Sequence, residues 1–167
     1  IQSTKQITRI MKHDKGVILL IILVSLMACQ QKYTYNQFLA IPANGWHQDS
    51  ILNYETNVEN ISATYDIYIS IRHNRTYPYQ NLWLFFAEWQ GDTLLQCDTI
   101  ECFLADEFGR WIGNGMTTYQ LQFPLAKQHR FQQTGTYQFT IQQAMRTEYL
   151  KGIQDVGLTI QYHNEQE

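Results

Sequence analysis

Tyr65-Asp-Ile-Tyr-Ile-Ser-Ile-Arg72 carries an apolar side chain at every second position. Successive side chains of a β-strand point to opposite faces, so this period predicts a strand that is buried on one face only. Residues 52–58 repeat the pattern, with Leu52, Tyr54, Thr56 and Val58 alternating with polar neighbours. The two stretches indicate a chain built mainly from half-buried strands.

Further strands are predicted along most of the remaining sequence. Residues 82–89 are apolar at both alternating sets of positions, which indicates a central or doubly covered strand. Gly91-Asp92 supplies a tight connection into residues 93–104, so the two stretches form a predicted hairpin. Later strands are expected near residues 118–123, 136–142 and 157–162. About seven to eight strands predict an all-β fold, an antiparallel β-sandwich of the jelly-roll or immunoglobulin-like type.

Helix is expected in two short stretches only. Residues 125–133, which end before Thr134-Gly135, and residues 143–150 each fit a helical turn or two. No internal repeat, charge block or linker rich in Gly, Ser and Pro divides the sequence beyond Cys29. The length of that part therefore predicts a single domain.

The N-terminal part has the layout of a signal peptide. Lys12 and Lys15 precede a nearly unbroken apolar run, Val17 to Ala28, which ends at Cys29. A membrane-spanning helix needs about 20 apolar residues, and this run is shorter. Leu26-Met-Ala-Cys29 resembles the lipobox of bacterial lipoproteins, although a methionine replaces the usual small residue. The alternative is an ordinary secretory signal in which the cysteine is incidental.

A lipobox implies that residues 1–28 are removed and that Cys29 becomes a lipidated N-terminus. Met11 looks like the biological start, which leaves residues 1–10 as upstream sequence. Two or more acyl chains, such as palmitate, hold a protein lastingly at a membrane, whereas one chain binds reversibly. We therefore expect the mature chain to be tethered to the cell envelope.

The tether and the folded part divide near residue 43. Residues 29–43 begin with polar side chains and contain Pro42, so we expect them to form a lipidated tether. Residues 44–167 then form the β-sandwich domain. Gln30 follows the cysteine where an aspartate would favour retention, and by its resemblance to lipoprotein sorting rules this implies the outer membrane, with the domain facing the periplasm.

The charge balance excludes nucleic acid as a partner. Four of the 12 Lys and Arg residues precede Cys29, whereas only Asp14 of the 15 Asp and Glu residues does, so the mature chain is clearly acidic. Binding to phosphates depends on clustered basic residues, and none are clustered here.

Cys97 and Cys102 remain once Cys29 is lipidated. A bridge is chemically allowed in the periplasm, but a separation of five residues places two side chains on opposite faces of a continuous strand. We therefore expect two packed or half-buried thiols, with a disulfide only if a β-bulge intervenes. No histidine lies within ten residues of the pair, so a metal site is not expected there.

Motifs of catalysis are absent from the sequence. It has no nucleophile elbow, no zinc-binding His pair, no phosphate-binding loop and no dinucleotide fingerprint, so we expect a protein that is not an enzyme and carries no metal or cofactor. Four carboxylates could supply an acid–base pair for catalysis: Asp98, Glu101, Asp106 and Glu107. A solvated strand edge and loop explains them better, because charged side chains normally lie outside. A hydrolase with a dispersed site is the remaining enzymatic alternative.

Aromatic residues gather in three expected loops, at residues 44–47, 74–82 and 105–115. Turn chemistry accounts for the Gly, Asn and Pro of these loops but not for the aromatic residues. Such side chains either anchor a loop to the core, which is the commoner case, or contact a partner. The candidate interaction residues are Trp46, Tyr77, Tyr79 and Trp111.

The same loops carry a resemblance to a known family. The chain resembles the gliding-motility lipoprotein GldH family of Bacteroidota, over nearly the whole mature domain and in the right order. The segments that carry the resemblance are the lipobox cysteine, Pro42-Ala-Asn-Gly-Trp-His47, Arg72-His-Asn-Arg-Thr-Tyr-Pro-Tyr-Gln-Asn-Leu82, residues 106–115, Phe131-Gln-Gln-Thr-Gly-Thr-Tyr137, Gln142-Gln-Ala-Met-Arg146 and Leu150-Lys-Gly-Ile-Gln-Asp-Val-Gly-Leu158.

This resemblance implies a component of the envelope apparatus for gliding motility, associated with the type IX secretion route and acting through contacts with other envelope proteins. It implies no catalytic residues. The alternative is a carbohydrate-binding β-sandwich lipoprotein, in which aromatic rings such as those of Trp83, Trp89 and Trp111 stack on sugars.

Overall fold

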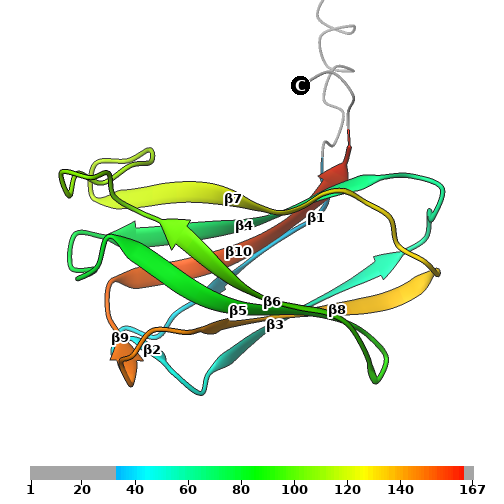
Figure 1. Ribbon diagram of the computed structural model, residues 1–167, viewed down its shortest axis with the longest axis horizontal. Coiled ribbons are helices and arrows are strands. Elements are labelled where there is room, and N and C mark those ends of the chain that lie inside the picture. Colours follow the sequence, from blue (N-terminus) through cyan, green and yellow to red (C-terminus); the bar gives the residue numbers. More distant parts are fainter. Residues whose placement is uncertain (1–32, 164–167) are drawn as a thin grey trace, which may run out of the picture. The chain divides into compact units, whose positions relative to one another are not determined.

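The computed structural model describes residues 33–163, and the chain is all-β over this range (Figure 1). The described strands in chain order are β1 (Tyr33–Ala40), β2 (Trp46–His47), β3 (Ile51–Val58), β4 (Tyr65–Asn74), β5 (Asn81–Gln90), β6 (Thr93–Phe103), β7 (Thr118–His129), β8 (Gly135–Gln143), β9 (Tyr149–Leu150) and β10 (Ile153–Tyr162). In this part of the chain no helix is long and apolar enough to cross a membrane.

Two four-stranded antiparallel sheets face each other. The first sheet has the strand order β1-β10-β4-β7, and the second sheet has the order β3-β8-β5-β6. The short strands β2 and β9 pair with each other outside both sheets. The predicted antiparallel β-sandwich is therefore confirmed, and the strands expected at residues 52–58 and 65–72 are present as β3 and β4.

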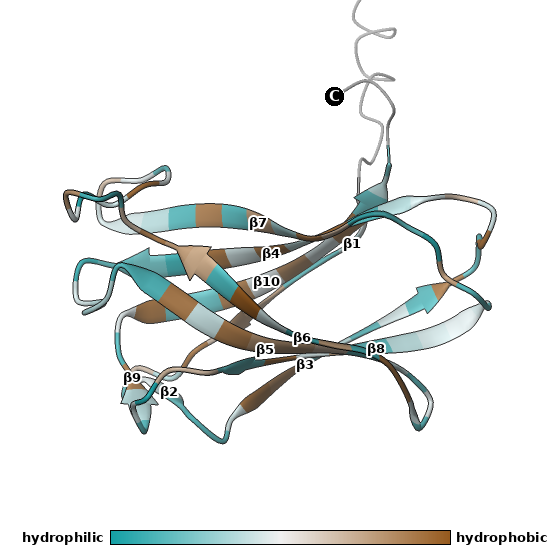
Figure 2. Cartoon of the chain, viewed as in Figure 1, coloured by the Kyte–Doolittle hydropathy of each residue, from teal (hydrophilic) through white to brown (hydrophobic). Residues whose placement is uncertain are grey.

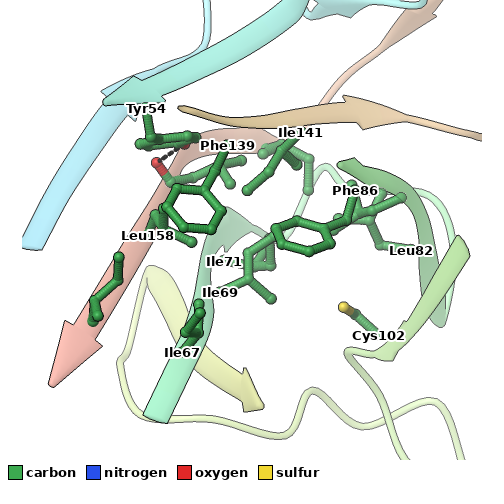
Figure 3. Close-up of a cluster of buried hydrophobic side chains, with 14 of the residues drawn as sticks. Tyr54, Ile67, Ile69, Ile71, Leu82, Phe86, Cys102, Phe139, Ile141 and Leu158 are labelled. Atoms are coloured by element: carbon green, nitrogen blue, oxygen red, sulfur yellow. Dashed lines mark hydrogen bonds between the residues drawn. The ribbon is translucent and has the colours of Figure 1, made fainter. Parts of the chain in front are cut away.

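The core lies between the sheets and is filled by alternate residues of the central strands. Ile67, Ile69 and Ile71 of β4 are almost fully buried (Figure 3). Side chains of β5 and β8 face them from the other sheet, and Leu158 of β10 lies beside them in the same sheet. Hydrophobic and hydrophilic bands alternate along β7, as the period-two pattern requires (Figure 2). Removing one such side chain from water is worth about 1.5 to 3 kcal/mol, so the shared core is the main stabilising feature.

A hydrogen bond also links the two sheets through this core. The buried hydroxyl of Tyr54 on β3 donates to the carbonyl oxygen of Val156 on β10 at 2.8 Å (Figure 3). Burial raises the pKa of Tyr54 well above its usual range, so the hydroxyl stays neutral and remains a donor.

β1 occupies residues that the sequence analysis assigned to the tether. It pairs with β10, and its side chains Tyr35 and Leu39 pack against the core. The alternation is hard to recognise in the sequence because the register shifts between Tyr33 and Tyr35. Cys29, the predicted signal peptide and the first residues of the predicted tether lie outside the described residues.

The two predicted helical stretches are wrong. Residues 125–129 continue β7, which pairs with β4 as far as His129, and residues 143–150 form a turn followed by β9. Local propensity favoured helix, but the hydrogen bonds offered by a neighbouring strand decide the conformation of an edge segment.

β5 lies between β8 and β6, as expected for a central strand, but it is not covered on both faces. Trp83 is 38% exposed and Phe85 is 48% exposed on the outer face of the second sheet. The hairpin predicted between β5 and β6 is confirmed, and Gly91 at its turn has a φ of 57°, which favours glycine.

Cys97 and Cys102 both lie on β6 and are not bridged. The two side chains lie on opposite faces, as the odd separation predicted, and Cys102 points into the core. The expectation that both thiols are packed or half-buried is wrong for Cys97, which is exposed because the outer face of an edge strand is open to solvent. Burial raises the pKa of the Cys102 thiol to about 12, so this thiol is unreactive at neutral pH.

We predict that a maleimide reagent labels Cys97 in the native protein and leaves Cys102 unmodified, because only the first thiol is accessible. Mass spectrometry of labelled peptides measures this, and unfolding in guanidinium chloride is expected to expose both thiols. Native labelling of Cys102 at the rate of Cys97 would contradict the described position of β6.

We predict that Tyr54→Phe destabilises the fold by about 1 to 3 kcal/mol, because the buried carbonyl of Val156 loses its side-chain donor. Equilibrium unfolding in urea measures the change. Tyr68→Phe is a suitable control, since Tyr68 is only half-buried. Equal stability of Tyr54→Phe and the parent would show that the bond between the sheets contributes nothing.

Candidate interaction surface at the loop-rich end

The connections that contain the predicted aromatic residues lie together at one end of the sandwich. The register pairs Asn74 with Thr118, Asn81 with Phe103 and Ile51 with Gln142, so the connections 41–50, 75–80, 104–117 and 144–152 leave the sheets together (Figure 1). We call this the loop-rich end. β1 begins and β10 finishes at the opposite end.

An aromatic cluster of His73, Tyr77, Trp111 and Tyr119 occupies the loop-rich end. The ring of His73 packs edge-on against Trp111 at 4.8 Å between centroids and stacks on Tyr119 at 5.4 Å. Tyr77 lies 5.8 Å from His73 and 6.4 Å from Trp111. The cluster therefore joins the end of β4, two connections and the start of β7 into one packed unit.

His73 is the polar centre of this aromatic cluster and is fully buried. Its Nδ1 lies 3.3 Å from the carbonyl oxygen of Asn74, and its Nε2 has no hydrogen-bond partner among the described residues. Burial lowers the pKa of His73 from its ordinary value of 6.5, and the contact with Asn74 offsets part of this effect. The ring is therefore held in its neutral form.

Two arginine contacts tie the connections at this end to each other. Arg75 donates from Nη2 to the carbonyl oxygen of Met116 at 3.1 Å and from Nε to the hydroxyl of Tyr119 at 3.2 Å. The connections 75–80 and 104–117, far apart in sequence, are thereby fixed side by side.

Asp106 shapes the longest connection from within. Its Oδ1 accepts from the backbone N–H groups of Phe108 and Arg110, both at 2.9 Å, and its Oδ2 accepts from the Arg110 guanidinium at 2.7 Å. These bonds hold the pKa of Asp106 below its usual value, and the bond from the Arg110 backbone N–H has the largest effect. The carboxylate therefore stabilises a turn that presents Phe108 to solvent.

A groove of about 450 Å³ lies beside the aromatic cluster. Residues of the stretches 41–45 and 151–154 line it together with Asn74 and Thr76. Gly152 has a φ of 90°, and a Cβ at this position would collide with the backbone of Tyr77. The wall of the groove and the cluster are therefore in direct backbone contact.

The four predicted interaction residues occupy different environments. Trp46 is fully buried and donates from its indole N–H to the carbonyl oxygen of Ser50 at 2.9 Å. Tyr77 is buried too, and its hydroxyl donates to the carbonyl oxygen of Asn81 at 2.7 Å. Trp111 is half-buried, and Tyr79 is 40% exposed. Both buried rings anchor their loops, and Trp111 packs against the core within the aromatic cluster, so Tyr79 is the most exposed of the four.

Sequence reasoning missed the most exposed apolar side chains of this end. Phe108 is 75% exposed and Met116 is 85% exposed, and both belong to the connection 104–117. The signal was present in the sequence, because an aromatic residue and a methionine among glycines and polar residues have no packing partner along the chain. The prediction weighed tryptophan and tyrosine only.

Groups that would support chemistry are not assembled here. Among residues 33–163 no three His, Cys, Asp or Glu side chains are arranged to hold a metal ion. Three of the four carboxylates considered from the sequence have local partners: Asp98 accepts from Gln96, Glu101 from Asn81 and Asp106 from Arg110. Their surroundings are those of a solvated strand and turn.

Comparison with known proteins identifies the family. The model of the GldH lipoprotein family matches residues 33–160, which is nearly all of the described part. The chain belongs to the GldH lipoprotein family. This confirms the resemblance found in the sequence, and membership in a lipoprotein family agrees with a lipid attached at the lipobox.

Two relatives are similar over most of their length. The gliding motility lipoprotein GldH of Flavobacterium johnsoniae is 29% identical over 158 residues, which cover 90% of this chain and 98% of the relative. The GldH homolog of Christiangramia forsetii is 33% identical over 144 residues, covering 80% and 86%. Among solved structures, a family GH115 4-O-methyl-alpha-glucuronidase matches 83% of this chain with a TM-score of 0.40 and 12% identity, and the chain spans 19% of that structure.

We predict that stability falls as the pH drops below about 6.5, because the unfolded state protonates His73 while the folded state resists protonation. The contribution is fully present above that pH and is lost as the pH falls toward the lowered folded pKa, with a slope of at most about 1.4 kcal/mol per pH unit. Urea unfolding of the parent and of His73→Phe across pH 5 to 8 measures it.

The difference between the two curves isolates the contribution of His73, because the other histidines are present in both proteins. A parallel pH dependence of the two proteins would mean that His73 is protonated equally easily in both states. We expect the free energy of unfolding of His73→Phe to depend less on pH than that of the parent.

Proposed function

We propose that this GldH family member is a non-enzymatic lipoprotein that acts in gliding motility and the associated type IX secretion machinery through protein contacts at its loop-rich end. The supporting observation is the family membership, together with exposed apolar side chains on an ordered set of loops. Both relatives are named gliding motility lipoproteins. The link with secretion rests on the resemblance found in the sequence.

The position of β1 suggests how the domain is presented. Three residues separate Cys29 from Tyr33, so an extended chain brings the lipid within about 14 Å of the start of β1. β4 has ten residues and is therefore about 33 Å long. A lipid on Cys29 holds the end of the sandwich where β1 begins near the membrane. The loop-rich end then points away from the membrane. We place this lipid in the outer membrane, with the domain in the periplasm.

The loop-rich end has the composition of a contact surface. Phe108, Ile112, Met116 and Tyr79 are exposed around the aromatic cluster. Exposed apolar side chains that gather on one region mark interaction sites more often than scattered ones do. The loops that carry them are held by Arg75 and Asp106, so little conformational entropy is lost on binding.

A second candidate function is carbohydrate binding, which one observation favours. Trp83 and Phe85 are exposed two residues apart on the outer face of the second sheet, where ring faces can stack on sugars. The other two tryptophans of the earlier hypothesis contribute less, since Trp89 and Trp111 are half-buried. We rank this candidate below protein contacts because relatives that match most of the chain are named gliding motility lipoproteins.

We predict that the lipoprotein, purified by a C-terminal tag from detergent-solubilised envelopes of its own bacterium, retains gliding or type IX secretion components. The triple variant Phe108→Ser, Met116→Ser, Tyr79→Ser is expected to remain folded and to lose them, because each side chain is exposed. Quantitative mass spectrometry measures recovery, and circular dichroism checks the fold.

Two controls separate the alternatives. Ile61→Ser and Tyr162→Ser remove exposed apolar side chains at the opposite end of the sandwich, outside the proposed contact surface, and should leave recovery unchanged. Cys29→Ala should abolish both anchoring and recovery. A preparation that lacks protein partners but retains glycan, and that loses it with Trp83→Ala, would replace the proposal with the sugar-binding candidate.

A further inference from the structure

β6 is a long edge strand whose outer side is open. It has 11 residues and pairs with β5 alone, and no other described segment forms backbone hydrogen bonds with it. Nearly all of its side chains are exposed or half-buried. Unpaired N–H and C=O groups on such an edge form a ready template for another strand.

The edge of β7 carries features that oppose strand addition, and the edge strands β1 and β3 lie against each other. β7 contains Pro124 and Lys127, two register shifts against β4, and Gln128 with a φ of 54°. β1 has a register shift near its start and lies in contact with β3 at the other side of the sandwich. Proline, lysine and irregular register are the usual means of protecting an edge, and β6 has neither proline nor lysine.

Apolar surface beside β6 is incompletely covered. Ile100 of β6 and the inward residues Leu121 and Phe123 of β7 pack against the core but stay half-buried. Leu94, Leu95 and Phe103 of β6 are exposed. A further strand along β6 would extend the second sheet over this side and remove apolar surface from water.

The charge of this region specifies the partner. β6 itself carries two acidic residues, Asp98 and Glu101, and no lysine, arginine or histidine, and Asp92 directly precedes it. Asp106 lies beyond the strand and is paired with Arg110. Opposite charges on facing strands stabilise a pair, and like charges destabilise it. An added strand that carries basic residues among apolar ones therefore fits this edge best.

The same charges disfavour a second copy of this chain as the occupant. Asp98 is the middle residue of β6, so a symmetric antiparallel pairing of two β6 strands brings the two Asp98 residues opposite each other. That register places like charges in direct contact at its centre.

We propose that the free edge of β6 binds an extended, basic and apolar segment of another protein as a fifth strand of the second sheet. Main-chain hydrogen bonds supply the affinity, and Asp98 and Glu101, which lie on opposite faces of β6, each select a basic residue on their own face of the segment. This surface is separate from the one proposed at the loop-rich end, and the variants of the preceding section leave it intact.

The test uses the full lipid-anchored chain in detergent and an 11-residue probe peptide of valines and lysines whose lysines are placed on both faces of the extended strand. Fluorescence anisotropy measures binding, and hydrogen exchange with mass spectrometry locates it. We expect slower exchange within Thr93–Phe103 and a loss of affinity of at least about tenfold for Asp98→Lys with Glu101→Lys. Glu55→Lys with Glu59→Lys, on exposed residues of the opposite side, makes the same change of net charge and should bind normally.

A second peptide distinguishes strand addition from simple charge attraction. Methylation of alternate backbone nitrogens keeps every side chain but removes the donors of one peptide edge, so its affinity should fall by at least about tenfold. Equal binding of the methylated peptide would overturn the proposal. So would equal weakening by the control pair, slowed exchange on β7 instead of β6, absence of binding at about 1 mM peptide, or a dimer of the chain protected along β6.

Discussion

The face-to-face burial of β4 and β10 against β5 and β8 is the constraint on which the rest of the structure depends. Because side chains alternate with a period of two, a shift of one residue in β4 would replace Ile67, Ile69 and Ile71 in the core by their neighbours along the strand. The register of the central strands is therefore fixed, and it also fixes where each connection leaves the sheets. The loop-rich end exists because the core permits a single alignment.

Regular alternation was the part of the fold that could be predicted, since it reports burial directly. It located β3, β4, β8 and the hairpin of β5 and β6. It failed for β1, whose pattern is interrupted by a shift in register, and for the second half of β7, which is a strand because β4 lies beside it. The conformation of an edge strand is determined largely by pairing with its neighbour, and the position of that neighbour cannot be read from a single sequence.

The candidate site was predictable in composition but not in arrangement. Aromatic residues in three loops were visible in the sequence, and the structure divides them into buried anchors such as Trp46 and exposed rings such as Tyr79. The role of His73 could not be read from spacing, because its neighbours Trp111 and Tyr119 come from a distant part of the chain. The acidic residues of β6 can be located from the sequence alone. Their significance depends on the position of β6 at the edge of its sheet, which only the structure provides.

The antiparallel pairing of β1 with β10 has a mechanical consequence. The ladder runs parallel to the line that joins the start of β1 to the loop-rich end. Under the proposal that Cys29 carries a lipid and that a partner binds the far end, a tensile load between the two pulls β1 along its own axis. Its hydrogen bonds are then loaded in shear and share the force, whereas a load across the strands would open them one after another. A domain attached in this way resists forced unfolding, which is governed by the rate of opening and not by equilibrium stability.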